Sequence, residues 1–343
     1  MDAKITKKRL GRMLSYDWLK IVGVAAALIF VWVMVFTTTA TRITAAQQFT
    51  AMNYTGNVMW GGTNKFNTLY NKALDDGIFS YEVLELTLND LTAAKDYAST
   101  VMEARLATDE GDIMFVADAP DEDTATTDKD GKTQYSRTYL ESFLARYRYH
   151  LFDLNPESDK SYFQQMEKYL DQYYGAVDGW KNPDNIDEAK IEKHFRERVK
   201  GDKRFKTEKS RAEGVKKDIA RIQKYRDALE KFYGYVAAGY IAYTYTEYTE
   251  GETSFEGYYS LNICPEKLAN GEDNTAVLET MYEYVGYRET YVDEEGNSGV
   301  VMTAKNMNVA FFDMEGVEEG FQYESLLFVN YLLETCIQAG SAK

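Results

Sequence analysis

Hydrophobic residues occur in one long uninterrupted run near the start of the chain and in short periodic groups after it. The run covers 21–40 and contains no charged residue. At about 1.5 Å rise per residue it spans about 30 Å, the thickness of the hydrocarbon core of a bilayer. No comparable run follows. The pattern predicts a leader at 1–20, a transmembrane helix at 21–40, a stem at 41–48 and a water-soluble body at 49–343.

Positive charges flank this run unevenly. Because Lys and Arg are retained on the cytoplasmic side of a membrane helix, we expect a cytoplasmic leader and an extracellular body on a single-pass cell-membrane protein. A secretory signal cleaved near Ala40 or Ala45 is the alternative, and it exports the same body. A lipoprotein anchor is disfavoured because the only cysteines, Cys264 and Cys336, lie far from the run. The flanking charges are Lys4, Lys7, Lys8, Arg9, Arg12 and Lys20 before the run and Arg42 after it.

The first part of the body alternates strand-like and helix-like patterns. Thr63 is a plausible N-cap for the first helix, and Asn89 and Asp90 for the second. Strand, helix, strand, helix and strand with short links predict parallel strands joined by right-handed crossovers, hence an α/β layer. The expected elements are a strand at 51–60, a helix at 63–74, a strand at 81–88, a helix at 91–107 and a strand at 112–117.

The rest of the body begins with an acidic, Thr-rich loop at 118–133. A calcium loop is not supported there, because Thr126 and Arg137 stand where its first and last carboxylates belong. Period-2 and period-3.6 patterns then resume. They predict helices at 138–149 and 162–174, a hairpin of strands at 240–249 and 255–263, a helix at 275–284, strands at 299–303 and 309–313, and a last helix at 323–338.

Charge is distributed unevenly along the body. Positions 1–42 hold 7 of the 39 basic and 2 of the 55 acidic residues, which leaves the body at −21. This acidity argues against a nucleic-acid partner, whose affinity comes largely from Lys and Arg. A basic helical segment at 186–236 interrupts it, and an amphipathic helix at 215–236 is expected within it. We favour a solvated helical face for this segment over a dock for an acidic partner or wall polymer.

Several local motifs, taken in order, resemble the bacterial extracellular solute-binding proteins of ABC importers, which have the type 2 periplasmic-binding-protein fold. The strand at 111–118 is similar to that family's Pro-Asp-Ile strand, and 140–156 to its next helix and turn. The strand at 257–261 is similar to its Gly-Tyr-Tyr-Ala-Leu strand, and 324–333 to a helix of its C-terminal lobe. The resemblance implies a bilobed α/β body and an ABC permease or another envelope protein as partner.

Two departures from this family stand out. The lipidated cysteine that usually tethers its members is missing, and the basic segment occupies the place of the second lobe.

Catalytic chemistry finds little support in the sequence. The two histidines, His150 and His194, belong to no nucleophile or metal arrangement, and HExxH, GxSxG, a Walker loop and CxxC do not occur. We therefore expect no enzyme, no metal and no cofactor, although a pair of carboxylates acting as a glycosidase site stays open. Cys264 and Cys336 either form a disulfide or are two buried thiols.

A ligand of an open α/β sheet binds at the carboxyl ends of its strands, so the loops after the first and third strands are the candidate site. Aromatic rings from elsewhere could close over a sugar ring or an organic cation. We expect a binding protein for a small polar ligand, with a structural scaffold lacking a pocket, or an envelope hydrolase, as alternatives. The candidate ligand-binding residues are Trp60, Gly61, Thr63, Asp118, Asp121, Trp180, Tyr258 and Tyr259.

Overall fold

The computed structural model describes residues 7–39, 47–54, 65–91, 97–129, 133–175, 177–292, 298–314 and 320–341. By their contacts, 1–43 form one unit and 44–343 a second unit, called the body below. Helix α1, Lys7–Thr39, makes up the described part of the first unit. Its stretch Trp18–Thr37 is long and apolar enough to cross a membrane, close to the run expected at 21–40.

A six-stranded mixed sheet forms the centre of the body, in the order β2-β1-β3-β10-β7-β6. Strand β1 pairs in parallel with β2 and β3. Strand β10 pairs antiparallel with β3 and β7, and β6 pairs antiparallel with β7. The strands are β1 Gln48–Asn53, β2 Glu85–Asp90, β3 Ile113–Ala117, β6 Ala242–Glu250, β7 Thr253–Asn262 and β10 Met307–Phe311.

Two smaller antiparallel ribbons lie outside this sheet. The first pairs β4, Ala125–Thr127, with β5, Thr133–Tyr135, within the loop expected at 118–133. The second pairs β8, Tyr287–Val292, with β9, Ser298–Thr303. The sequence patterns predicted β9 but neither β8 nor the first ribbon.

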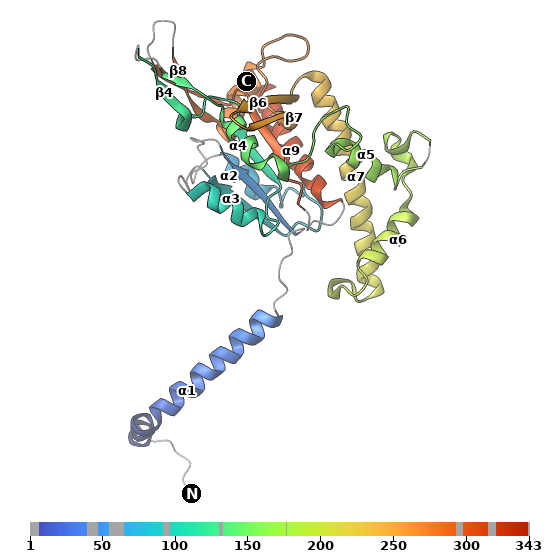
Figure 1. The fold of residues 1–343 in the computed structure, drawn as a ribbon. Coiled ribbons are helices and arrows are strands. Elements are labelled where there is room, and N and C mark those ends of the chain that lie inside the picture. Colours follow the sequence, from blue (N-terminus) through green and yellow to red (C-terminus); the bar gives the residue numbers. More distant parts are fainter. Residues whose placement is uncertain are drawn as a thin grey trace. The chain divides into compact units, whose positions relative to one another are not determined.

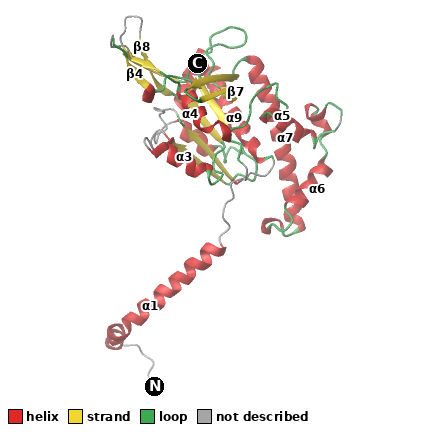
Figure 2. Ribbon diagram, viewed as in Figure 1, coloured by secondary structure: helices red, strands yellow, loops and turns green. Residues whose placement is uncertain are grey.

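The central sheet is covered by helices on both faces (Figure 2). Alternate residues of β3 show the division, since Phe115 belongs to the larger core and Met114 to the smaller one. Helices α2, α5, α7, α8 and α9 contribute to the larger core, and α3 and α4 to the smaller core. The α-helices are α2 Lys65–Lys72, α3 Ala98–Leu106, α4 Tyr139–Tyr147, α5 Tyr162–Asp171, α6 Glu188–Arg198, α7 Glu208–Ala238, α8 Thr275–Val285 and α9 Glu324–Ser341.

Helix α7 is the longest helix of the described body, and α6 runs beside it (Figure 1). Thr207 caps its start, because its hydroxyl accepts a hydrogen bond from the backbone N–H of Ser210 at 3.1 Å. Gly239 ends it with φ +83°, where a Cβ would lie 2.2 Å from the backbone nitrogen of Ala269. A glycine is therefore required at this position. Short 3-10 turns connect the helices, at η3 Glu122–Thr124, η4 Arg148–His150, η5 Gly179–Lys181, η6 Pro183–Asn185, η7 Lys203–Phe205 and η8 Phe321–Tyr323.

The expected α/β layer is present, with shifted boundaries. β2 begins at Glu85 instead of 81, because residues 81–84 form a turn and an extended link ahead of it. Asn89 and Asp90 are therefore strand residues and not helix caps, and α3 begins only at Ala98. A bilobed body is not confirmed, since 44–343 cluster as one unit and their described part holds one large sheet.

Candidate functional site

The connections between β1, β2 and β3 place a topological switch point in the sheet. From β1 the chain passes to β2 on one side and then returns to β3 on the other side. Helices α2 and α3 accordingly pack into different cores, on opposite faces. Loops that leave neighbouring parallel strands toward opposite faces open a crevice at their carboxyl ends. The loop after β3 is described by the structure, whereas residues 55–64, which follow β1, lie outside the described residues.

Polar groups line the carboxyl edge of these three strands. Asn53, the last residue of β1, is fully buried, and its Nδ2 donates a hydrogen bond to Oδ1 of Asp90 at 3.1 Å. Asp118 follows β3 directly, and its side chain is exposed. Its backbone N–H donates to the carbonyl of Asn306 at 2.9 Å, which fixes the start of the loop. This edge of the sheet therefore carries the exposed carboxylate of Asp118 and the hydrogen-bonded side chains of Asn53 and Asp90.

Asp121 differs from Asp118 because both of its carboxylate oxygens accept hydrogen bonds from other residues of the body. Oδ1 accepts a hydrogen bond from the backbone N–H of Asp123 at 3.0 Å, and Oδ2 accepts one from the hydroxyl of Ser142 at 2.5 Å. The residue is only 6% exposed. Asp121 thus ties the loop after β3 to helix α4.

Tyr258 and Tyr259 lie on opposite faces of β7. Tyr258 packs against the larger core, and Tyr259 against the smaller one. The pairing shifts here, because Thr244 of β6 pairs with Ser260 and Tyr245 with Tyr258, which leaves Tyr259 as the extra residue of a β-bulge. The two rings cannot close over one ligand together.

Trp180 belongs to η5, away from the strand ends, and packs against α7. Its ring stacks on Tyr233 at 6.3 Å between centroids, and its backbone N–H donates to Oδ1 of Asp171 at 3.0 Å. The side chain is 5% exposed, so it is a packing residue of the larger core. The remaining predicted residues, Trp60, Gly61 and Thr63, lie outside the described residues.

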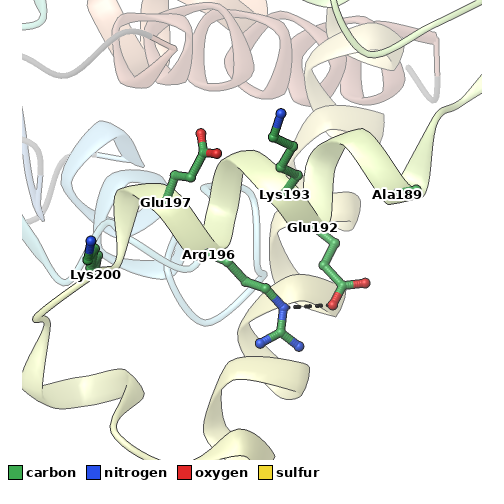
Figure 3. Close-up of a pocket in the computed structure, with 6 residues that line it drawn as sticks. All are labelled: Ala189, Glu192, Lys193, Arg196, Glu197 and Lys200. Carbon is green, nitrogen blue, oxygen red and sulfur yellow. Dashed lines mark hydrogen bonds and ion pairs between the residues drawn. The ribbon is translucent and has the colours of Figure 1, made fainter.

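The outer face of α6 carries a shallow hollow of about 450 Å³ (Figure 3). Charges of both signs line it, and Nε of Arg196 contacts Oε1 of Glu192 at 2.7 Å. Figure 3 shows Lys193 and Glu197 pointing to one side of the helix and this ion pair to the other. All the residues that line the hollow belong to one segment, 189–200.

The inner face of the basic segment contains a buried ionic cluster. Oδ1 of Asp218 accepts hydrogen bonds from Nε of Arg221 and Nη2 of Arg198, each at 2.8 Å. Nη2 of Arg198 also contacts the hydroxyl of Tyr81 at 2.8 Å. Arg221 is 1% exposed and Asp218 is 3% exposed. Two guanidinium groups therefore share one buried carboxylate.

A second buried carboxylate, Glu324, lies near this cluster. Burial raises the pKa of Glu324, against the hydrogen bonds it accepts and the nearby Arg221 charge. Its Oε1 accepts from the hydroxyl of Tyr225 at 2.5 Å, and its Oε2 accepts from the backbone N–H of Ser80 at 3.0 Å. These bonds join α9, α7 and the link before β2.

The sequence analysis did not identify this ionic cluster, although α7 carries a signal for it. The buried stripe of α7 includes Asp218, Arg221 and Tyr225 beside the expected apolar residues, of which Val215, Ile222 and Leu229 are buried. Two opposite charges three residues apart within an apolar stripe indicate a buried ion pair, because neither could be buried alone.

In the ranges that the structure describes, no group of three or more His, Cys, Asp and Glu side chains is placed to hold a metal ion. Cys264 and Cys336 are both buried free thiols, so the disulfide alternative is not realised. Comparisons of the chain with known protein families, curated proteins and solved structures find no match.

Proposed function

We propose that this protein is a single-pass, membrane-anchored binding protein. It binds a small polar, sugar-like solute or a surface partner outside the cell, without catalysis. The observation that carries the proposal is the switch point between β1 and β3. An open α/β sheet with this connectivity offers its ligand crevice at these two carboxyl ends.

The chemistry of the two loops suits a polar ligand. The loop after β1 includes Trp60, whose indole offers a face for a sugar ring, followed by two glycines that let backbone approach a ligand. The loop after β3 offers the exposed Asp118 carboxylate, which accepts hydrogen bonds from hydroxyl groups. An aromatic face and a carboxylate together are a common way to hold a carbohydrate.

The location of the body, its fold type and its partner are further parts of this proposal. The excess of Lys and Arg before the apolar helix supports an extracellular body. The resemblance to type 2 solute-binding proteins leads us to propose that the six-stranded sheet and the helices packed on it correspond to one lobe of that fold. An ABC permease or another envelope protein is the partner that this relationship implies.

A thermal-shift screen of the purified chain against sugars, peptides and amines tests the proposal. A ligand that binds only the folded state raises the melting temperature. Asp118→Asn should then weaken the best ligand about tenfold, a loss typical of a charged hydrogen-bond acceptor. Asp123→Asn, an equal charge change at an exposed position of the same loop, should leave the affinity unchanged. Silence across a broad library, or equal effects of both variants, would contradict the proposal and favour a scaffold without a pocket.

A further inference from the structure

A second cavity lies at the opposite, amino edge of the sheet. It has a volume of about 340 Å³ and lies between α7 and the segment 74–83. This segment leads into the start of β2, and the backbone N–H of Leu84 donates to the carbonyl of Gln47 just before β1. The cavity is therefore distinct from the crevice at the carboxyl ends, and its volume falls in the range of about 300–1,000 Å³ found for small-molecule pockets.

The charges that line this cavity are all positive. Lys217, Arg221 and Lys224 come from successive turns of α7, and none of the lining residues is acidic. The ammonium of Lys224 contacts the carbonyls of Gly77 and Phe79, the latter at 3.0 Å. The ammonium of Lys217 lies 5.8 Å from the centre of the Tyr81 ring on an exposed side chain. An ammonium at the rim is thus available to a ligand.

Arg221 supplies the decisive feature. Its side chain is almost completely buried, yet Nη1 has no hydrogen-bond partner within the described part of the chain. Its Nε is bound to Asp218, and its guanidinium carbon lies 4.8 Å from the centre of the Phe321 ring. Buried donors are nearly always paired, so an unpaired guanidinium N–H beside a cavity indicates a missing acceptor.

The charge balance points the same way. Arg198 and Arg221 share the single carboxylate of Asp218, while the nearby Glu324 is bound to Tyr225 and Ser80. The neighbouring acid Glu82 is already paired with Arg204 at 2.8 Å. An anion in the cavity would add a counter-charge beside the two guanidinium groups that share Asp218.

We propose that this cavity binds a small oxyanion, the phosphate or carboxylate group of a solute, between the guanidinium of Arg221 and the ammonium of Lys217. Arginine matches both groups through paired N–H donors, and lysine adds a point charge. The proposal goes beyond the function proposed above and does not depend on it, because the two sites lie at opposite edges of the sheet.

Calorimetric titration of the full chain in detergent tests the proposal, with inorganic phosphate and succinate as separate probes and chloride holding the ionic strength constant. We expect one ion per chain, and the stronger of the two probes identifies the ligand group. Lys217→Gln should weaken binding about tenfold by removing a charge-assisted contact. Lys216→Gln is the matched control, because it removes the same charge from an exposed neighbour that does not line the cavity.

Arg221→Lys provides a second variant that keeps the charge and removes the guanidinium fork. If it folds, as judged by its circular dichroism, it should bind the probe more weakly than Lys217→Gln does. If it does not fold, the contrast between the two lysine variants decides alone. Absence of binding by both probes at millimolar concentration, or equal losses in Lys217→Gln and Lys216→Gln, would overturn the proposal, and water alone would then complete the Arg221 bonds.

Discussion

Asp112→Asn should stabilise the body at neutral and alkaline pH. Asp112 precedes β3, and its Oδ2 accepts a hydrogen bond from the backbone N–H of Thr50 at 2.7 Å. Burial raises the pKa of its carboxyl to about 7, although this hydrogen bond opposes the rise, and the nearby Glu324 adds to it. An asparagine can accept the same bond from Thr50 through its carbonyl oxygen, but it carries no charge that must be buried.

The sign and size follow from linkage between protonation and folding. The pKa is higher in the folded state than the value of about 3.9 in the unfolded chain, so the folded state holds the proton more tightly. The contribution of Asp112 protonation to the free energy of unfolding is therefore complete below about pH 4, falls as the pH rises, and is lost above about pH 7. The full change is at most about 4 kcal/mol. Because Asp112 keeps some exposure, we expect about 2 kcal/mol between about pH 5 and pH 8.

Urea unfolding of residues 44–343, which form a unit of their own, measures this difference. The Asn variant should exceed the wild type in free energy of unfolding by about 2 kcal/mol more at pH 8 than at pH 5. Asp184→Asn, at an exposed position, should show no such difference. A variant that is less stable than the wild type at pH 8, or equally shifted at both pH values, would refute the reasoning.

Three further predictions concern the packing of the body. Asp218→Ala should lower the free energy of unfolding by about 3–5 kcal/mol in urea titrations, because it leaves two arginines without their shared buried carboxylate. A loss below about 1 kcal/mol would contradict the buried cluster. Gly239→Ala should cost about 2 kcal/mol in the same assay, since φ is +83° and the new Cβ would meet backbone, and unchanged stability would contradict this cap. Cys264 and Cys336 should resist iodoacetamide in the native protein and react after unfolding, because both are fully buried. Burial also raises the pKa of each thiol, that of Cys336 to about 12. Labelling of the native protein without urea would contradict their burial.

The secondary structure was predictable wherever a single periodicity dominated. The strand at 112–117 was placed almost to the residue, because β3 is buried on both faces and reads as a continuous apolar run. The predicted helix at 215–236 lies within α7, and its expected apolar face is buried at Val215, Ile222 and Leu229. Stacking of Phe232 on Phe163 at 4.1 Å helps to set the rotation of α7, and that contact joins segments far apart in sequence.

The arrangement of the site depended on pairings that no local pattern contains. The position of β1 between β2 and β3, which creates the switch point, is set by long-range pairing. Tyr258 and Tyr259, by contrast, face different cores as neighbouring strand residues ordinarily do, so alternation alone separates these two rings. The cavity beside Arg221 required α7 to meet the link before β2, and spacing in the sequence does not reveal that meeting.

Hydrogen exchange of the full chain, with and without the solute that stabilises it most in the thermal-shift screen, tests the binding account most directly. Bound ligand slows exchange of the backbone amides that it covers or orders. We predict protection in the loops that follow β1 and β3, at 54–65 and 117–122, with 217–224 unchanged. Protection confined to other segments, with both loops exchanging as fast as in the free protein, would contradict a ligand site at the β1 and β3 carboxyl ends.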